Sequence, residues 1–212
     1  DPEKLKALFE IENAFKAGQL SADEARLQIK ERVGKVSAYH VAYIEQTMTE
    51  ETSDECIRED VHAVINMLGD QIDNSMPNLP ADHPIMHYLK ENEEMKRLLL
   101  AVEDLVQYPM IKNQWLELYD KISQYPVHYK RKQNQLYPVL ERKGFTRPTT
   151  TMWTFDDLVR DEIREAERLL REDQEEAFIK QQERVLLYAR DLMEKEEFIL
   201  YPTSMALISE EE

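Results

Sequence analysis

HYKRKQNQLYPVLE, residues 128–141, lies in the second of four long segments that have the apolar spacing of amphipathic helices. The four expected helices run over about 83–107, 110–142, 154–171 and 174–199, and short connections separate them. Long helices joined by short connections pack antiparallel, side by side. The sequence therefore predicts an antiparallel four-helix bundle.

The chain before residue 70 has shorter periodic segments. Several short helices are expected there, one opened by a capping box at Ser21–Glu24 and another by one at Thr52–Glu55. Asp70–Asp82 then breaks the pattern with two prolines and several Asn and Asp residues. We expect an all-α protein in three parts: a small helical domain over 1–72, a linker over 73–82 and the bundle over 83–212.

Composition narrows the choice of function. Only four of the 212 residues are glycine, which disfavours β-sandwiches and glycine-loop nucleotide folds. A net charge of −16 repels nucleic acid and anionic membrane surfaces, so neither is expected as a partner. The single cysteine, Cys56, rules out an intrachain disulfide framework. With no transmembrane-length apolar run, a cytoplasmic location is expected.

Three histidines of the predicted bundle are candidates for metal binding. His83 and His87 are four residues apart and share one helix face, and His128 lies on the second long helix. A bundle interior that gathers histidines and carboxylates from facing helices is a common way to build an iron or manganese site. A single histidine is more often an ordinary core or surface residue, so spacing alone indicates a metal only weakly.

Residues 128–141 resemble the H-Y-x-R-K-E-N-x-L-F-P-x-L-E signature of hemerythrin-like (HHE cation-binding) domains. Other segments resemble further motifs of one subgroup of this family: 82–92 its opening, 149–160 its M-W segment and 195–202 its closing K-E-E-N-I-L-F-P. In that subgroup a small helical domain of unknown function precedes the bundle, and residues 43–46 and 60–63 resemble that domain. The resemblance implies a hemerythrin-like bundle behind such a domain.

Hemerythrin-like domains hold a non-haem iron centre, usually with two irons, between histidines and carboxylates of the four helices. The resemblance implies five candidate metal ligands here, and iron or another divalent metal as the cofactor: His83, His87, His128, Asp156 and Glu196.

The sequence departs from the family pattern at three of the expected ligand positions. Lys132 stands where a bridging carboxylate is expected, Asp156 where the third helix should offer a histidine, and Leu192 where the fourth should. Lys132 would repel a metal and could pair with Asp156 or Glu196 instead. These changes disfavour a full di-iron centre. They leave a mononuclear site or a buried polar network without metal.

Three functions stay open. The first is a regulatory, non-enzymatic module that binds a single metal ion and responds to oxygen, nitric oxide or redox state. The resemblance implies a PAS-type signalling domain as its partner, and a homodimer is compatible with it. The second is a metal-free interaction scaffold, and the third a di-iron protein of oxygen, nitric oxide or iron–sulfur repair chemistry. Metal analysis separates them: about one, zero or two irons per chain, respectively.

Overall fold

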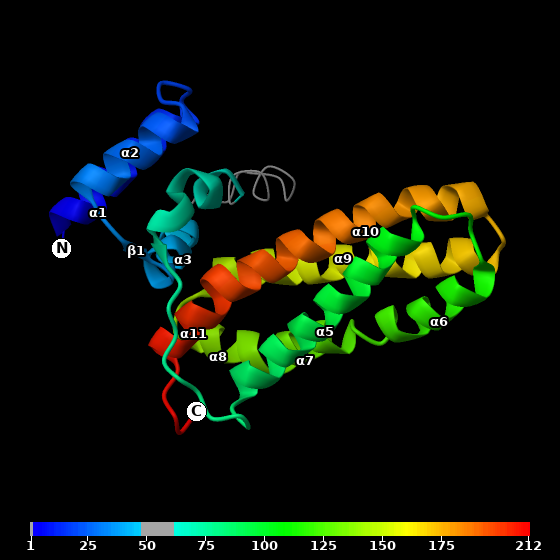
Figure 1. Cartoon of the computed structure of the whole chain (residues 1–212). Helices are drawn as coiled ribbons and strands as arrows, with labels where there is room; N and C mark the ends of the chain where they lie inside the picture. The colour runs from blue at the N-terminus through cyan, green and yellow to red at the C-terminus, as the bar shows by residue number, and fades with distance from the viewer. Residues whose placement is uncertain (1, 48–61) are drawn as a thin grey trace. The chain divides into compact units, whose positions relative to one another are not determined.

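The computed structural model describes residues 2–47 and 62–212, and almost all of them are helical or lie in short connections (Figure 1). The all-α prediction is confirmed. The second expected capping box, Thr52–Glu55, and Cys56 lie outside the described residues. In the described part of the chain, no helix combines the length and the apolar character that crossing a membrane requires.

The chain falls into two compact units. The first, here called the N-terminal unit, comprises Asp1–Met76 and Phe198–Leu207, and the second, the bundle unit, comprises Pro77–Glu197 and Ile208–Glu212. The chain leaves the N-terminal unit after Met76, inside the linker predicted at 73–82. The prediction assigned all of 83–212 to the bundle, whereas Phe198–Leu207 groups with the N-terminal unit, since helix α11 (Tyr201–Leu207) packs on α3 (Ala38–Thr47).

In its described residues, the N-terminal unit is built from short helices and one pair of parallel two-residue strands. Its other elements are α1 (Pro2–Lys16), α2 (Ala22–Arg32), β1 (Val36–Ser37), a helical segment over 62–68, η1 (Gly69–Gln71) and β2 (Ile72–Asp73). The predicted capping box at the start of α2 is confirmed. The Glu24 amide donates to the Ser21 hydroxyl at 3.3 Å, and the Ser21 amide donates to the Glu24 carboxylate at 2.9 Å.

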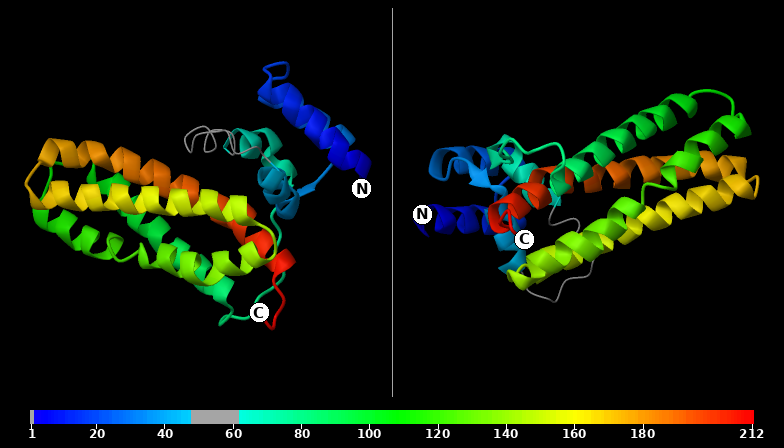
Figure 2. Two further views of the ribbon diagram at one scale, coloured as in Figure 1. Left: turned by 180° about the vertical axis from the view of Figure 1, so that it is seen from behind. Right: turned by 90° about the horizontal axis from the view of Figure 1, so that it is seen from below.

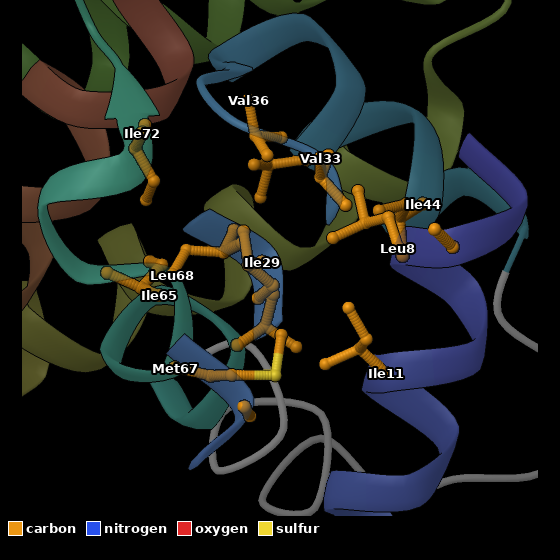
Figure 3. Packing of buried hydrophobic residues seen from close by; sticks show 14 residues of the cluster. Leu8, Ile11, Ile29, Val33, Val36, Ile44, Ile65, Met67, Leu68 and Ile72 are labelled. Atoms are coloured by element: carbon orange, nitrogen blue, oxygen red, sulfur yellow. The ribbon is translucent and has the colours of Figure 1, made fainter. Parts of the chain in front are cut away.

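The core of the N-terminal unit is hydrocarbon. Figure 3 shows aliphatic side chains from its helices and strands converging on one another, together with Met67, whose sulfur is drawn in yellow. Ile29, Met67 and Leu68 are fully buried. Such a cluster is held by burial of apolar surface and by close packing, and neither requires a particular partner atom.

The bundle unit contains four long helical rods that run alongside one another (Figure 2). The first, third and fourth rods are α5 (Pro84–Leu105), α9 (Thr146–Arg171) and α10 (Glu175–Lys195), and the second is divided into α6 (Lys112–Ile122), α7 (Val127–Arg131), η2 (Lys132–Leu136) and α8 (Tyr137–Arg142). The predicted four-helix bundle is therefore confirmed. The second rod is interrupted before α7, where Pro126 lacks the amide that a continuous helix would use.

The predicted start of the third bundle helix at residue 154 is wrong, because α9 begins at Thr146. Pro148 lies in the first turn, where its missing amide would have no intrahelical partner in any case. The Thr154 hydroxyl does not cap a helix; it donates to the Thr150 carbonyl oxygen at 3.2 Å, inside the helix.

Two π-helical turns place the residues of the site. One is η2, and the other is η3 (Glu196–Leu200), which follows α10. Each leads directly into a Tyr-Pro pair, Tyr137–Pro138 and Tyr201–Pro202. A proline inside a helix removes one hydrogen bond and crowds the carbonyl four residues earlier, and a wider turn accommodates both effects. Lys132 and Glu196 are the first residues of the two turns.

Candidate functional site

The centre of the bundle unit is a buried ion pair network. Lys132 of η2 has no solvent-exposed side-chain surface, and its ammonium lies 2.6 Å from Asp156 Oδ1 and 2.9 Å from Glu196 Oε2. Asp156 belongs to α9 and Glu196 to η3, and both carboxylates are also fully buried. The predicted pairing of Lys132 is confirmed, with both carboxylates at once. We call Lys132, Asp156, Glu196 and His128 the charged centre.

His128 connects the charged centre to the first rod of the bundle. Its Nε2 lies 2.6 Å from Glu196 Oε2, and its Nδ1 lies 2.6 Å from Glu91 Oε2 of α5. Each ring nitrogen therefore faces a carboxylate oxygen, which can only accept a hydrogen bond when ionised. Burial lowers the pKa of His128, but Glu196 and Glu91 outweigh this and raise it above its ordinary value. The two carboxylate neighbours therefore favour the protonated form of the ring, an imidazolium that can donate to both.

The two carboxylates of the charged centre differ in their pKa values. Burial raises the pKa of Glu196, but Lys132 and His128 outweigh it and bring this pKa down to about 2. Asp156 has a pKa raised to about 6, because burial and the nearby Glu196 charge outweigh the attraction of Lys132. The Tyr137 hydroxyl donates to Asp156 Oδ2 at 2.6 Å. Glu196 is thus the more firmly ionised of the two.

The charged centre also has neighbours that sequence reasoning did not assign to the site. Glu91 forms an ion pair with Arg131 as well as with His128, and its side chain is 24% exposed. Tyr137 bonds to Asp156, and Gln133 Nε2 donates to Asp157 Oδ1 at 3.3 Å. The available signal for Glu91 was its place in the segment 82–92 that resembles the opening family motif. Its role as a partner of His128 depends on the packing of two helices.

The structure brings three of the five predicted metal ligands together, namely His128, Asp156 and Glu196. His83 and His87 lie elsewhere. His83 is the N-cap of α5, where its Nδ1 accepts a hydrogen bond from the Ile85 amide at 3.1 Å, and His87 is exposed. Within residues 2–47 and 62–212, no group of three or more His, Cys, Asp or Glu side chains is arranged to hold a metal ion.

The donor chemistry of the charged centre does not fit the metal ion that a hemerythrin-like fold implies. A histidine binds a metal through the lone pair of a neutral ring nitrogen, and both His128 nitrogens face carboxylates instead. The two buried carboxylates already contact the Lys132 ammonium, which would lie against any added cation. A metal would have to displace a buried positive charge from its two counter-ions.

The comparisons with known proteins identify the family. Residues 82–204 match the family described as the hemerythrin HHE cation binding domain. Neither the curated proteins nor the solved structures gave a match. The matched segment extends from just before α5 into α11 and covers more than half of the chain. The chain therefore belongs to the hemerythrin HHE cation-binding domain family.

Proposed function

We propose that this chain is a non-enzymatic regulatory module whose bundle transmits a structural state rather than performing metal or gas chemistry. The proposal depends on the fully buried Lys132 ammonium, which lies between Asp156 and Glu196. This ammonium occupies the two carboxylates that would otherwise be available to bind a ligand. A catalytic or oxygen-binding centre needs an open position for its substrate. Here each of the four groups of the charged centre already contacts an oppositely charged group.

The connectivity of the chain supports a regulatory role. Glu196, which contacts both Lys132 and His128, begins η3, and the boundary between the two compact units falls inside this turn. The chain continues into α11, which packs on α3 within the N-terminal unit. A change in the packing of Glu196 is therefore covalently linked to an element of the other unit. π-helical turns within helices occur frequently at functional sites, which is consistent with a role for η3.

Hydrogen exchange followed by mass spectrometry tests this proposal. Lys132→Met should increase amide exchange in η3 and α11 as well as in the bundle, since Glu196 loses one of its two buried partners, Lys132 and His128. Phe178→Ala is the matched control: Phe178 is buried against Trp115 and Tyr119, and its loss should increase exchange in the bundle and leave α11 unchanged. Exchange in α11 that responds equally to both variants, or to neither, would overturn the proposal.

The chemical part of the proposal has a separate test. Purified protein supplied with Fe(II) should develop no visible absorption band on exposure to oxygen or nitric oxide. A coloured centre with one metal ion per chain that responds to either gas, and that is absent from His128→Ala, would contradict this part of the proposal. It would favour the metal-binding sensor instead. The predicted PAS-type partner and the homodimer stay predictions.

A further inference from the structure

The Lys132 side chain is buried along its whole length, in a compartment that carboxylates and aromatic rings line. Two carboxylates contact its ammonium, and the rings of Tyr129 and Tyr137 have their centroids 5.2 and 5.7 Å from Nζ. Aromatic faces attract cations through their quadrupole, most strongly where water is excluded. Carboxylates and ring faces together form a suitable environment for an ammonium group that carries an alkyl chain.

The contacts of this compartment suit a monovalent cation. The two carboxylates that line it, Asp156 and Glu196, are fully buried and both contact the Lys132 ammonium. A divalent metal added beside the ammonium would bring two further positive charges into this buried site, where unpaired charges are very costly. A single ammonium between the two carboxylates brings no such excess.

We propose that the centre of the bundle unit contains a cation cage for a primary ammonium group, and that Lys132 is the permanent occupant of this cage in place of a metal ion. The cage consists of Asp156, Glu196 and the ring faces of Tyr129 and Tyr137. It recognises its cation by two carboxylates and two aromatic ring faces, so the same compartment without the Lys132 side chain selects a small primary alkylammonium ion over a divalent metal. This inference does not depend on the regulatory role proposed above.

Chemical rescue tests the inference. Lys132→Ala removes the ammonium and most of its chain, and it should lower the melting temperature by about 10 °C, since two buried carboxylates lose the ammonium that both of them contact. Refolding in the presence of n-propylammonium should recover part of this loss in a saturable manner, while Zn²⁺ and Mn²⁺ should not. The wild type should show no response to the amine.

Lys195→Ala is the matched control, because Lys195 is also buried, pairs with Asp191 at 2.7 Å and lies 5.0 Å from the Phe155 ring centroid. Its counter-ion is partly exposed, so water can solvate the carboxylate once the lysine is gone and no amine rescue is expected. Rescue of Lys132→Ala by a divalent metal but not by the amine would overturn the proposal. Equal amine effects on both lysine variants would do the same.

A second variant covers the case in which Lys132→Ala does not fold. Lys132→Cys, in a chain whose one native cysteine Cys56 is replaced by serine, is alkylated in denaturant and then refolded. Displacement of bromide from 2-bromoethylamine by the introduced thiolate forms a thioether with a terminal ammonium, a near copy of lysine. This product should refold and regain most of the wild-type melting temperature, whereas the neutral iodoacetamide product should not. Equal recovery by both products would show that the cage needs no cation.

Discussion

The two cores of this protein are built on opposite principles. The core of the N-terminal unit is a cluster of aliphatic side chains (Figure 3), whereas the centre of the bundle unit holds an ammonium, an imidazolium and two carboxylates. An aliphatic cluster tolerates exchanges of similar volume, because burial of apolar surface does not depend on individual partners. A buried ion network fails when a single partner is lost, since the remaining charge is left without water. The comparison predicts different responses to substitution.

The largest effect is expected at Lys132. Lys132→Met should lower the free energy of unfolding by about 3–5 kcal/mol, because Asp156 loses its ammonium partner and Glu196 loses one of its two buried partners, Lys132 and His128. Adding Asp156→Asn to this variant should restore about 2 kcal/mol, since one of the uncompensated charges is removed. Urea unfolding at neutral pH measures both. Additive losses in the double variant would mean that the two residues do not act as a pair.

The aliphatic core should respond to volume instead. Leu68→Ala should cost about 3 kcal/mol, because Leu68 is fully buried and the cavity fills only in part. Leu68→Met nearly conserves the volume and should cost less than about 1.5 kcal/mol. The same unfolding experiment applies. If the methionine variant is as unstable as the alanine variant, the N-terminal core does not tolerate an exchange that conserves side-chain volume.

The pH dependence of stability should also separate the two regions. The pKa of His128 is higher in the folded protein than in the unfolded chain, so its stabilising contribution is present below about pH 6.5 and is lost as the pH rises through the folded value. The difference in unfolding free energy between wild type and His128→Gln should therefore shrink from pH 6 to pH 9. His87→Gln, at an exposed position outside the charged centre, is the control for the loss of an imidazole ring as such. If the difference in unfolding free energy between wild type and His128→Gln instead widens as the pH rises, His128 is not stabilised in its protonated form.

The smallest effect is expected at a helix terminus of the N-terminal unit. Ser21→Ala removes the hydroxyl that accepts the Glu24 amide, and it should cost about 1 kcal/mol. Thermal unfolding monitored by circular dichroism measures this change. A loss as large as that of Leu68→Ala would indicate that the cap, rather than the aliphatic core, determines the stability of this unit.

The fold was predictable to a greater extent than the site. Apolar periodicity and short connections identified the four rods, and the positive charge of Lys132 predicted a pairing with Asp156 or Glu196. The pairing of His128 with Glu91 was not predictable, because it depends on the rotation of α5 and α7 about their axes. The start of α9 was missed because Pro148 and the threonines around it are typical of a loop as well as of a first helical turn.

Metal analysis of the wild-type protein tests most directly whether an ammonium group, rather than a metal ion, is the cation at the centre of the bundle. The protein is expressed in medium supplemented with iron, manganese and zinc, purified without chelators and analysed by plasma mass spectrometry, with Lys132→Glu beside it. We expect well below one metal atom per chain in the wild type, and a higher content only in Lys132→Glu, where a carboxylate replaces the ammonium. One or two metal atoms per wild-type chain, lost in His128→Ala, would contradict it.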